Sequence, residues 1–332
     1  MRRPPVALVR WNRAGSRSSG LAPVVAGLTL ETMNDASNGQ AGPVAAGETT
    51  RCGLAVLVGR TNVGKSTLLN ALVGRKLSIV TPKPQTTRDP IQGVVNRAGG
   101  QIVFVDTPGF FKTHANRLVE RLHERARRAL QGIDVVVHVV DPTRPVGPED
   151  EMVLEALQGV SQPRLLCLNK SDLPDRPYTD FWRGRQSEYA GCYEVSAYTG
   201  QGLEELVEGI LRHLPVGPPL YPPEQVTNAN QRFLIGELIR EKVYLMMDDE
   251  VPYRTAVEVH AVEETRDKTG RPMLHIKASI LAANPRYQRM LIGAGGRRIR
   301  EIGQAARMDL EAQLGRKVFL DMDVLVDRSL GK

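Results

Sequence analysis

Leu54-Ala-Val-Leu-Val-Gly-Arg-Thr-Asn-Val-Gly-Lys-Ser66 carries the strongest structural signal in the chain. Its apolar start, Leu54 to Val58, predicts a buried strand, and the loop that follows matches the pattern GxxxxGK[ST]. A helix is expected to open at Lys65, as this pattern requires. Glycines let successive backbone N–H groups face phosphate oxygens, and the amino end of a helix adds partial positive charge. The stretch therefore predicts a loop that binds the phosphates of a nucleotide.

Two side chains of this loop have expected chemical roles. The Lys65 ammonium is predicted to reach the β and γ phosphates, which makes Lys65 a candidate catalytic residue, and the Ser66 hydroxyl is predicted to be a ligand of Mg²⁺. The expected nucleotide contacts of the loop are Gly59, Arg60, Thr61, Asn62, Val63, Gly64, Lys65, Ser66 and Thr67.

Apolar runs alternate with helix-like segments through residues 51–215. Strands are predicted at 54–58, 102–105, 135–140, 164–168 and, shorter, at 193–195, and helices at 65–72, 116–129, 149–157 and 203–213. This alternation predicts an α/β domain with a doubly wound, mostly parallel sheet. Its ligand is expected at the carboxyl ends of the strands.

The motif Asp106-Thr-Pro-Gly109 directly follows the apolar run 102–105. At a strand end, the Asp106 carboxylate can hold the Mg²⁺ shell, usually through water, and the Gly109 N–H can reach the γ phosphate. We therefore predict Asp106 as a metal-binding residue and Gly109 as a catalytic one. The expected nucleotide contacts here are Asp106, Thr107, Pro108, Gly109 and Phe110.

The motif Asn169-Lys-Ser-Asp172 follows the run 164–168 and predicts which base is bound. An Asp172 carboxylate can accept hydrogen bonds from N1–H and the exocyclic amino group of guanine, a donor pair that adenine lacks. Selection by paired polar groups discriminates strongly, because the wrong base leaves a buried carboxylate unpaired. A backbone N–H near guanine O6 completes the expected pocket, whose residues are Asn169, Lys170, Asp172, Ser196 and Ala197.

A second domain is predicted after a proline-rich linker at 216–224. Over residues 225–328 the expected order is a helix at 231–245, strands at 255–263 and 273–282, helices around Arg289 and at 297–314, and a strand at 317–326. This order is α+β and smaller than the first domain.

The turn Ile292-Gly-Ala-Gly-Gly296 lies between two predicted helices and has the GxxG form of a type II KH domain, which clamps single-stranded nucleotides. Clustered arginines around it favour phosphate, although neither residue between the glycines is basic. The alternative is an ordinary α+β domain with a solvated arginine face. The candidate RNA-binding residues are Ile292, Gly293, Ala294, Gly295, Gly296, Arg289, Arg297, Arg298 and Arg300.

Composition indicates which kinds of partner and which cellular setting suit the chain. The net charge of +7 and the pI of about 9.4 suit a polyanionic partner or a solubilising surface, and three cysteines without metal-ligand spacing suggest a reducing, cytoplasmic setting. The chain has no apolar run long enough to span a membrane. Residues 1–50 are expected to be a disordered extension, with a transit peptide, a weak RNA-binding tail or a start at Met33 as alternatives.

The order of phosphate loop, DTPG, NKSD and Ser-Ala resembles the TRAFAC class of GTPases. Within it, the segment Pro84-Gln-Thr-Thr-Arg-Asp89 resembles the first switch of the Era and TrmE-like branch, where a threonine closes on Mg²⁺ and the γ phosphate. We expect Thr87 in this catalytic and metal-binding role, with Thr86 second. Phe110 stands where related enzymes carry a catalytic glutamine, so slow intrinsic turnover is expected. Asn62 matches a K⁺ ligand of potassium-dependent relatives, or is a solvated loop residue.

A GTPase of this branch joined to a type II KH domain resembles the Era family. The resemblance implies a GTP-hydrolysing ribosome-assembly factor that binds the 3′ end of small-subunit ribosomal RNA under the control of GTP, in the cytoplasm, with peripheral association at the inner face of the cell membrane as a further implication. Two alternatives stay open from the residues themselves. One is an RNA-binding protein with a structural nucleotide, and the other is a GTPase that docks to a protein or a membrane.

Overall fold

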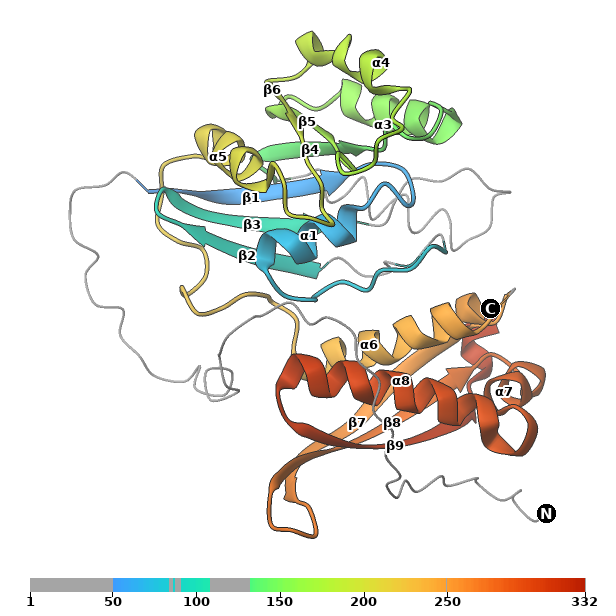
Figure 1. Cartoon of the computed structure of the whole chain (residues 1–332). Helices are drawn as coiled ribbons and strands as arrows, with labels where there is room; N and C mark the ends of the chain where they lie inside the picture. The colour runs from blue at the N-terminus through green and yellow to red at the C-terminus, as the bar shows by residue number, and fades with distance from the viewer. Residues whose placement is uncertain (1–49, 84–85, 87–90, 108–131, 249, 332) are drawn as a thin grey trace. The chain divides into compact units, whose positions relative to one another are not determined.

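The computed structural model of the protein describes residues 50–83, 86, 91–107, 132–248 and 250–331 (Figure 1). The chain divides between Ala229 and Asn230 into two units. Residues 1–49 of the predicted extension and the predicted helix at 116–129 lie outside the described residues.

The first unit is built on a six-stranded sheet of order β2-β3-β1-β4-β5-β6 (Figure 1). Neighbouring strands are parallel, except that the edge strand β2 runs antiparallel to β3. This confirms the predicted mostly parallel α/β sheet. The strands are β1 (Arg51–Val58), β2 (Ile91–Arg97), β3 (Gly100–Asp106), β4 (Val135–Val140), β5 (Arg164–Leu168) and β6 (Gly191–Glu194).

Helices cover both faces of this sheet. Because side chains alternate along a strand, Leu57 of β1 belongs to the buried cluster of α1 and α5, whereas Val56 belongs to the cluster of α3 on the opposite face. Trp182 of the short α4 is buried with Leu166 of β5. The described helices of this unit are α1 (Lys65–Val73), α3 (Pro148–Gln158), α4 (Thr179–Arg183) and α5 (Leu203–His213).

Two strands differ from the sequence-based expectation. The edge strand β2 was not predicted, because glycine and polar residues interrupt the apolar pattern of Ile91-Gln-Gly-Val-Val-Asn-Arg97. This segment forms a strand through its pairing with β3. The strand β6 begins two residues and ends one residue earlier than predicted, since its register with β5 pairs Gly191 with Leu165 and Glu194 with Leu168. Both features depend on a partner strand rather than on local pattern.

The segment 216–228, which contains the predicted linker, lies along the β2 edge of the sheet. The buried Gln101 amide donates to the Tyr221 carbonyl at 2.8 Å and accepts from the Tyr221 N–H at 2.9 Å. The Thr227 hydroxyl donates to the Gln92 carbonyl at 2.7 Å. The Gln101 side chain belongs to β3, whereas the bond to Gln92 occupies a backbone group of the edge strand β2, where unpaired groups favour association with other chains.

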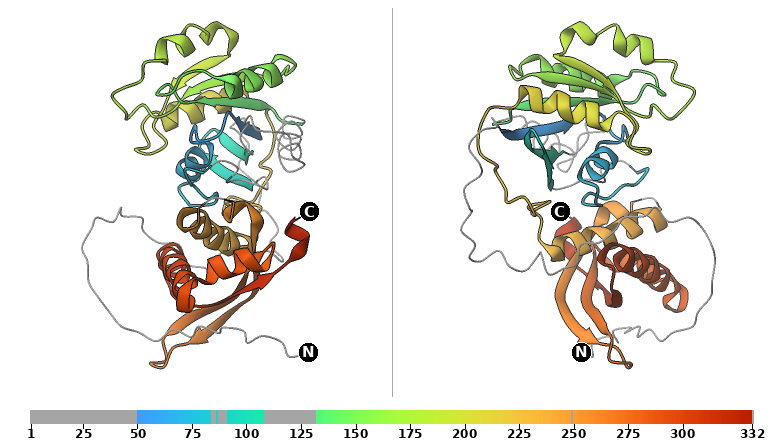
Figure 2. Two further views of the ribbon diagram at one scale, coloured as in Figure 1. Left: turned by 90° about the vertical axis from the view of Figure 1, so that its right-hand side faces the viewer. Right: turned by 60° about the vertical axis from the view of Figure 1, so that its left-hand side comes forward.

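The second unit is a three-stranded sheet of order β7-β8-β9 covered by helices on one face (Figure 2). Strand β7 is antiparallel to β8, and β8 is parallel to β9. Its elements follow the predicted α+β order. Among the described helices of both units, none is long and apolar enough to cross a membrane. The elements of the second unit are α6 (Gln231–Met246), β7 (Thr255–Arg266), β8 (Pro272–Ala282), α7 (Pro285–Ile292), α8 (Arg297–Leu314) and β9 (Lys317–Val326).

His138 of β4 is a fully buried titratable group in the first unit. Its Nδ1 lies 2.8 Å from the Tyr189 hydroxyl, and its ring packs edge-on against Trp182 at a centroid distance of 5.5 Å. Burial, with repulsion from Arg185 and Lys65, lowers the pKa of His138 to about 3. The folded protein therefore holds this imidazole neutral where an unfolded chain would protonate it.

We expect this buried histidine to make the first unit sensitive to acid. The pKa of His138 is lower in the folded protein than in the unfolded chain, so its contribution to the free energy of unfolding is fully present above about pH 6.5 and is lost as the pH falls. The free energy of unfolding should therefore decrease by about 2 kcal/mol between pH 7.5 and pH 5. Urea denaturation at both pH values measures it. His138→Gln should reduce this pH dependence, whereas His213→Gln, at a partly exposed histidine of the same unit, should leave it unchanged.

Candidate functional site

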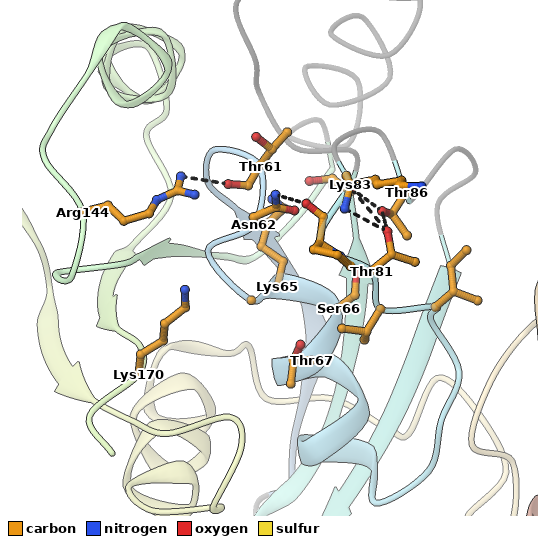
Figure 3. Close-up of a pocket in the computed structure, with 15 residues that line it drawn as sticks. Thr61, Asn62, Lys65, Ser66, Thr67, Thr81, Lys83, Thr86, Arg144 and Lys170 are labelled. Carbon is orange, nitrogen blue, oxygen red and sulfur yellow. Dashed lines mark hydrogen bonds between the residues drawn. The ribbon is translucent and has the colours of Figure 1, made fainter. Parts of the chain in front are cut away.

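A cavity of about 410 Å³ opens at the carboxyl ends of the parallel strands, where the fold predicts a ligand (Figure 3). The loop after β1 forms its floor. Lys170 and Arg144 lie on one side of this loop and Thr81, Lys83 and Thr86 on the other (Figure 3). The lining residues are Thr61, Asn62, Gly64, Lys65, Ser66, Thr67, Ile79, Val80, Thr81, Pro82, Lys83, Thr86, Thr107, Arg144 and Lys170.

The glycines of the predicted phosphate loop are required by close packing. Gly59 has a φ of +157°, and a Cβ added there would lie 2.3 Å from the Val139 carbonyl oxygen. Gly64 has a φ of +98°, and its added Cβ would lie 2.3 Å from Asn169 Nδ2. Larger residues would push the loop away from β4 and from the loop after β5, so these glycines hold the cavity floor against the sheet.

Lys65 begins α1 and is buried within the loop. Its Nζ donates to the Gly59 carbonyl at 3.0 Å and to the Arg60 carbonyl at 2.8 Å. Burial lowers the pKa of Lys65 to about 8, against the opposing attraction of Asp106 and Glu149. A phosphate in the cavity would supply the negative charge that this ammonium needs.

Ser66 and Asp106 meet beside Lys65. The Ser66 hydroxyl donates to Asp106 Oδ2 at 2.8 Å, and Asp106 is fully buried at the end of β3. The hydroxyl of the neighbouring Thr107 donates to the Leu57 carbonyl at 2.8 Å, which fixes the start of the loop. A carboxylate and a hydroxyl side by side at a phosphate loop fit Mg²⁺, which takes oxygen ligands.

The predicted base pocket is connected to the phosphate loop by Asn169. Its Nδ2 donates to the Val63 carbonyl at 2.8 Å, and its Oδ1 accepts from the Ala197 N–H at 3.0 Å. The Ala197 N–H, one of the backbone N–H groups of the predicted pocket, is thus bonded to Asn169 in this geometry. Asp172 is held by Ser196, whose hydroxyl donates to Asp172 Oδ1 at 2.6 Å. These residues of two loops therefore support one another.

Two residues of the predicted phosphate loop bind other parts of the unit through their side chains. The Arg60 guanidinium points away from the cavity and forms a buried ion pair with Asp150 of α3, 2.7 Å between Nη1 and Oδ2. Asn62 has a positive φ of 61°, and its Nδ2 donates to the Pro82 carbonyl at 2.7 Å. Only the backbone of Arg60 remains at the loop.

The first-switch residues are described in part. Thr86 lines the cavity, and its hydroxyl lies 2.7 Å from that of Thr81 and donates to the Lys83 carbonyl at 2.7 Å. The predicted residues Thr87, Pro108, Gly109 and Phe110 lie outside the described residues.

The sequence-based site omits Arg144, Thr81 and Lys83, which line the cavity. Arg144 follows the carboxyl end of β4 by four residues, so the same rule that located Asp106 at the end of β3 was available for this loop. Thr81 and Lys83 carry no comparable signal, because no strand or motif precedes them directly.

The GxxG turn joins α7 to α8. Gly293 has a φ of +71°, and a Cβ there would lie 2.7 Å from the Arg298 Cβ, which explains the first glycine. Arg300 donates to the carbonyls of Gly295 and Gly296, so its guanidinium stabilises the turn itself. Arg298 pairs with Glu301 at 2.9 Å.

The other candidate residues divide between surface and core. The arginines Arg289 and Arg297 are exposed on either side of the turn, as are Ala294 and Gly295 within it. Ile292 is half-buried against the core of the second unit. Arg298 and Arg300 are exposed as well but are bonded to Glu301 and to the turn, so Arg289 and Arg297 are the exposed candidate arginines with no such bond in the described residues.

Comparison with known proteins agrees with both halves of the chain. A family model described as 50S ribosome-binding GTPase matches residues 54–170, and one described as KH domain matches residues 250–329. The GTPase Era of Halothermothrix orenii is 38% identical over 280 residues, which cover 84% of this chain and 94% of that protein. The GTPase Era of Ectopseudomonas mendocina is 41% identical over 282 residues, with 83% and 92% covered.

Solved structures give the same result. A variant of Aquifex aeolicus Era bound to GDP and AlF₄⁻ superposes with a TM-score of 0.76 at 35% identity, covering 84% of this chain and 94% of that one. Era in complex with MgGDPNP and nucleotides 1506–1542 of 16S ribosomal RNA superposes with the same TM-score, identity and coverage. The expected resemblance is confirmed, and the chain belongs to the Era family of GTPases.

Proposed function

We propose that this protein is a GTP-hydrolysing ribosome-assembly factor that binds single-stranded small-subunit ribosomal RNA near its 3′ end, with GTP controlling binding and release. The observation that carries the proposal is the pairing, in one chain, of a phosphate loop tied to a base-recognition loop with a GxxG turn flanked by exposed arginines. It is supported by the Era structure that contains both MgGDPNP and 16S ribosomal RNA.

In this proposal the cavity binds GTP or GDP. Lys65 contacts the β and γ phosphates, Asp172 pairs with guanine, and Ser66, Asp106 and Thr87 hold the metal shell. The 2.8 Å bond between Ser66 and Asp106 supports this metal assignment. When bound, Mg²⁺ would neutralise charge on the phosphates. The chain's own contribution is to orient the triphosphate and to supply Lys65 beside it, together with the Gly109 N–H.

Catalysis is proposed to be slow without a partner. Phe110 and Phe111 follow the DTPG motif, and neither side chain can orient an attacking water as glutamine does. Stabilisation must then come from backbone N–H groups, Lys65, Mg²⁺, a partner or a monovalent cation.

The proposal includes a monovalent cation, K⁺, that assists hydrolysis and has Asn62 as its ligand. Asn62 lines the cavity, and its Nδ2 already donates to Pro82, so the amide oxygen can be turned toward the phosphates. We expect hydrolysis to be faster in KCl than in NaCl at equal ionic strength. Asn62→Ala should remove the difference, and equal wild-type rates in the two salts would remove K⁺ from the mechanism.

The second unit is proposed to bind RNA through its turn, with single-stranded nucleotides clamped at Gly293 to Gly296 and phosphates attracted by Arg289 and Arg297. The cytoplasm is the proposed location, and peripheral association with the inner face of the cell membrane stays a prediction from the resemblance.

The deciding experiment measures GTP hydrolysis with a short single-stranded RNA from the 3′ end of small-subunit ribosomal RNA and with an unrelated RNA. Stimulation by the ribosomal sequence alone supports the assembly factor. An equal response to both RNAs, or to neither, would leave a GTPase with an unassigned second unit. GTP and RNA affinities should also rise by the same factor in each other's presence, because coupling between two sites is reciprocal.

Changing the turn itself tests the RNA assignment. We expect Gly293→Asp together with Arg297→Ala to weaken RNA binding by about tenfold or more, because a side chain at Gly293 displaces the turn from Arg298, a negative charge is added, and an exposed cation is lost. Fluorescence anisotropy with labelled RNA measures this, and GTP binding should not change. Arg328→Ala, at an exposed arginine beyond β9, is the matched control. Unchanged RNA binding in the double variant would favour a docking role for this unit.

A further inference from the structure

The loop after β4 holds a buried carboxylate beside the nucleotide cavity. Asp141 lies directly after the last residue of β4, and its side chain is fully buried. Its Oδ1 accepts from the Thr143 hydroxyl at 2.6 Å and from the Thr143 N–H at 3.0 Å, which fixes the carboxylate in a tight turn. The carboxylate therefore has one set orientation.

The other oxygen of this carboxylate faces two cations of the cavity wall. Lys170 Nζ lies 2.5 Å from Asp141 Oδ2, and Arg144 Nε lies 3.8 Å from the same oxygen. Both Lys170 and Arg144 line the cavity (Figure 3). Arg144 also reaches the phosphate loop, where its Nη2 donates to the Thr61 carbonyl at 3.4 Å.

Lys170 has a backbone conformation that needs support. Its φ is +65°, in the left-handed region that residues with a Cβ adopt at a cost. Lys170 lies between Asn169 and Asp172, so its conformation sets how the base-recognition loop leaves β5. The ion pair to Asp141 is a long-range contact that holds this residue in place.

We propose that Asp141 is a positioning residue of the guanine-nucleotide site, which holds Lys170 and Arg144 on the cavity wall and joins the base-recognition loop to the phosphate loop. Asp141 does not line the cavity and acts through these two cations. Burial raises the pKa of Asp141, but the hydrogen bonds from Lys170 and Thr143 and the charge of Lys170 together outweigh it and lower the pKa, in agreement with a carboxylate that stays charged. The inference rests on the proposed nucleotide site.

The test uses the full chain, GDP as the probe, and Asp141→Asn, which keeps the shape of the side chain and its bonds to Thr143 but removes the charge. We expect about tenfold weaker GDP binding and faster GDP release, as for contacting groups that act as a unit. Glu194→Gln is the matched control, since Glu194 ends β6 in ion pairs with Arg176 and Arg183, and it does not line the cavity. It should bind GDP as the wild type does.

A double-mutant cycle separates positioning from a merely structural role. If Asp141 acts through Lys170 and Arg144, adding Asp141→Asn to a background with Lys170→Met and Arg144→Met should weaken GDP binding by less than about twofold beyond that background alone. Independent, multiplying effects would overturn the proposal, as would wild-type affinity in Asp141→Asn. If Asp141→Asn does not fold, Thr143→Val provides the second route. It should weaken GDP binding by about threefold, and this loss should disappear in the background that lacks both cations. Wild-type GDP affinity in the single variant Thr143→Val would also count against the proposal.

The nucleotide site itself can fail separately from this inference. If wild-type protein and Lys65→Ala bind GDP equally, the site assignment is wrong, whatever Asp141→Asn does. If the wild type binds tightly and Lys65→Ala does not, the site stands and the Asp141 variants alone decide the positioning role.

Discussion

Lys65→Ala is expected to weaken GTP binding by about 100-fold or more, because removal of one partner from a buried, charged contact leaves the phosphate charge uncompensated. The ammonium is prepared for this contact, since it is buried beside the carbonyls of Gly59 and Arg60. Isothermal titration calorimetry with GTP measures the effect. Arg75→Ala, at an exposed cation just beyond the end of α1, is the control and should bind as the wild type does.

The lowered pKa of Lys65 adds a pH signature to the same experiment. With a pKa of about 8 in the free protein, the ammonium is charged at pH 7 and loses its proton as the pH rises through 8. GTP binding favours the charged form, so wild-type affinity should fall from pH 7 to pH 8.5 and binding should take up protons. Lys65→Ala should show no such fall. A wild-type affinity that is independent of pH over this interval would contradict the role of the ammonium.

Asp172→Asn is expected to exchange base preference, with GTP affinity reduced by about 100-fold or more and xanthosine triphosphate bound more tightly than GTP. The Asp172 carboxylate accepts hydrogen bonds from N1–H and the exocyclic amino group of guanine. An asparagine amide has one oxygen that accepts and one NH₂ group that donates, and this NH₂ group suits the carbonyl that xanthine carries in place of the amino group. Ser196 keeps the side chain oriented through its bond to Oδ1. Competition binding with both nucleotides reads out the preference.

The control for this exchange is Asp175→Asn, at an exposed acid three residues further along. It should retain guanine selectivity. Retained selectivity in Asp172→Asn itself would mean that another group reads the base, and the assignment of the pocket would have to be abandoned.

Both predictions start from motifs that the sequence alone identifies. The phosphate loop and the acids Asp106 and Asp172 each follow an apolar run, and parallel strands bring their carboxyl ends to one edge of a sheet. The GxxG turn was found in the same way, between two helices of the expected order. Such signals are local, because they depend on residues within one strand, turn or helix start.

The contacts that assemble the site needed the tertiary structure, because their partners are far apart in the chain. Asn169 reaches Val63 across 106 residues, and Arg60 turns from the phosphate loop to Asp150 across 90 residues. No sequence pattern near Arg60 predicts that Asp150 is its ion-pair partner. The strand β2 likewise exists through pairing with β3, and Gln101 is buried by a segment more than a hundred residues later.

The sequence by itself determined the two fold classes and most of their elements, and it predicted which residue types meet the phosphates, the base and the RNA, since apolar periodicity and turn chemistry act over a few residues. Tertiary structure decided which polar side chains support one another: Asn169 between two loops, Arg60 away from the cavity, and Asp141 beneath Lys170. Buried polar groups must find hydrogen-bond partners wherever packing places them, and those partners are fixed by the whole sheet rather than by any one segment.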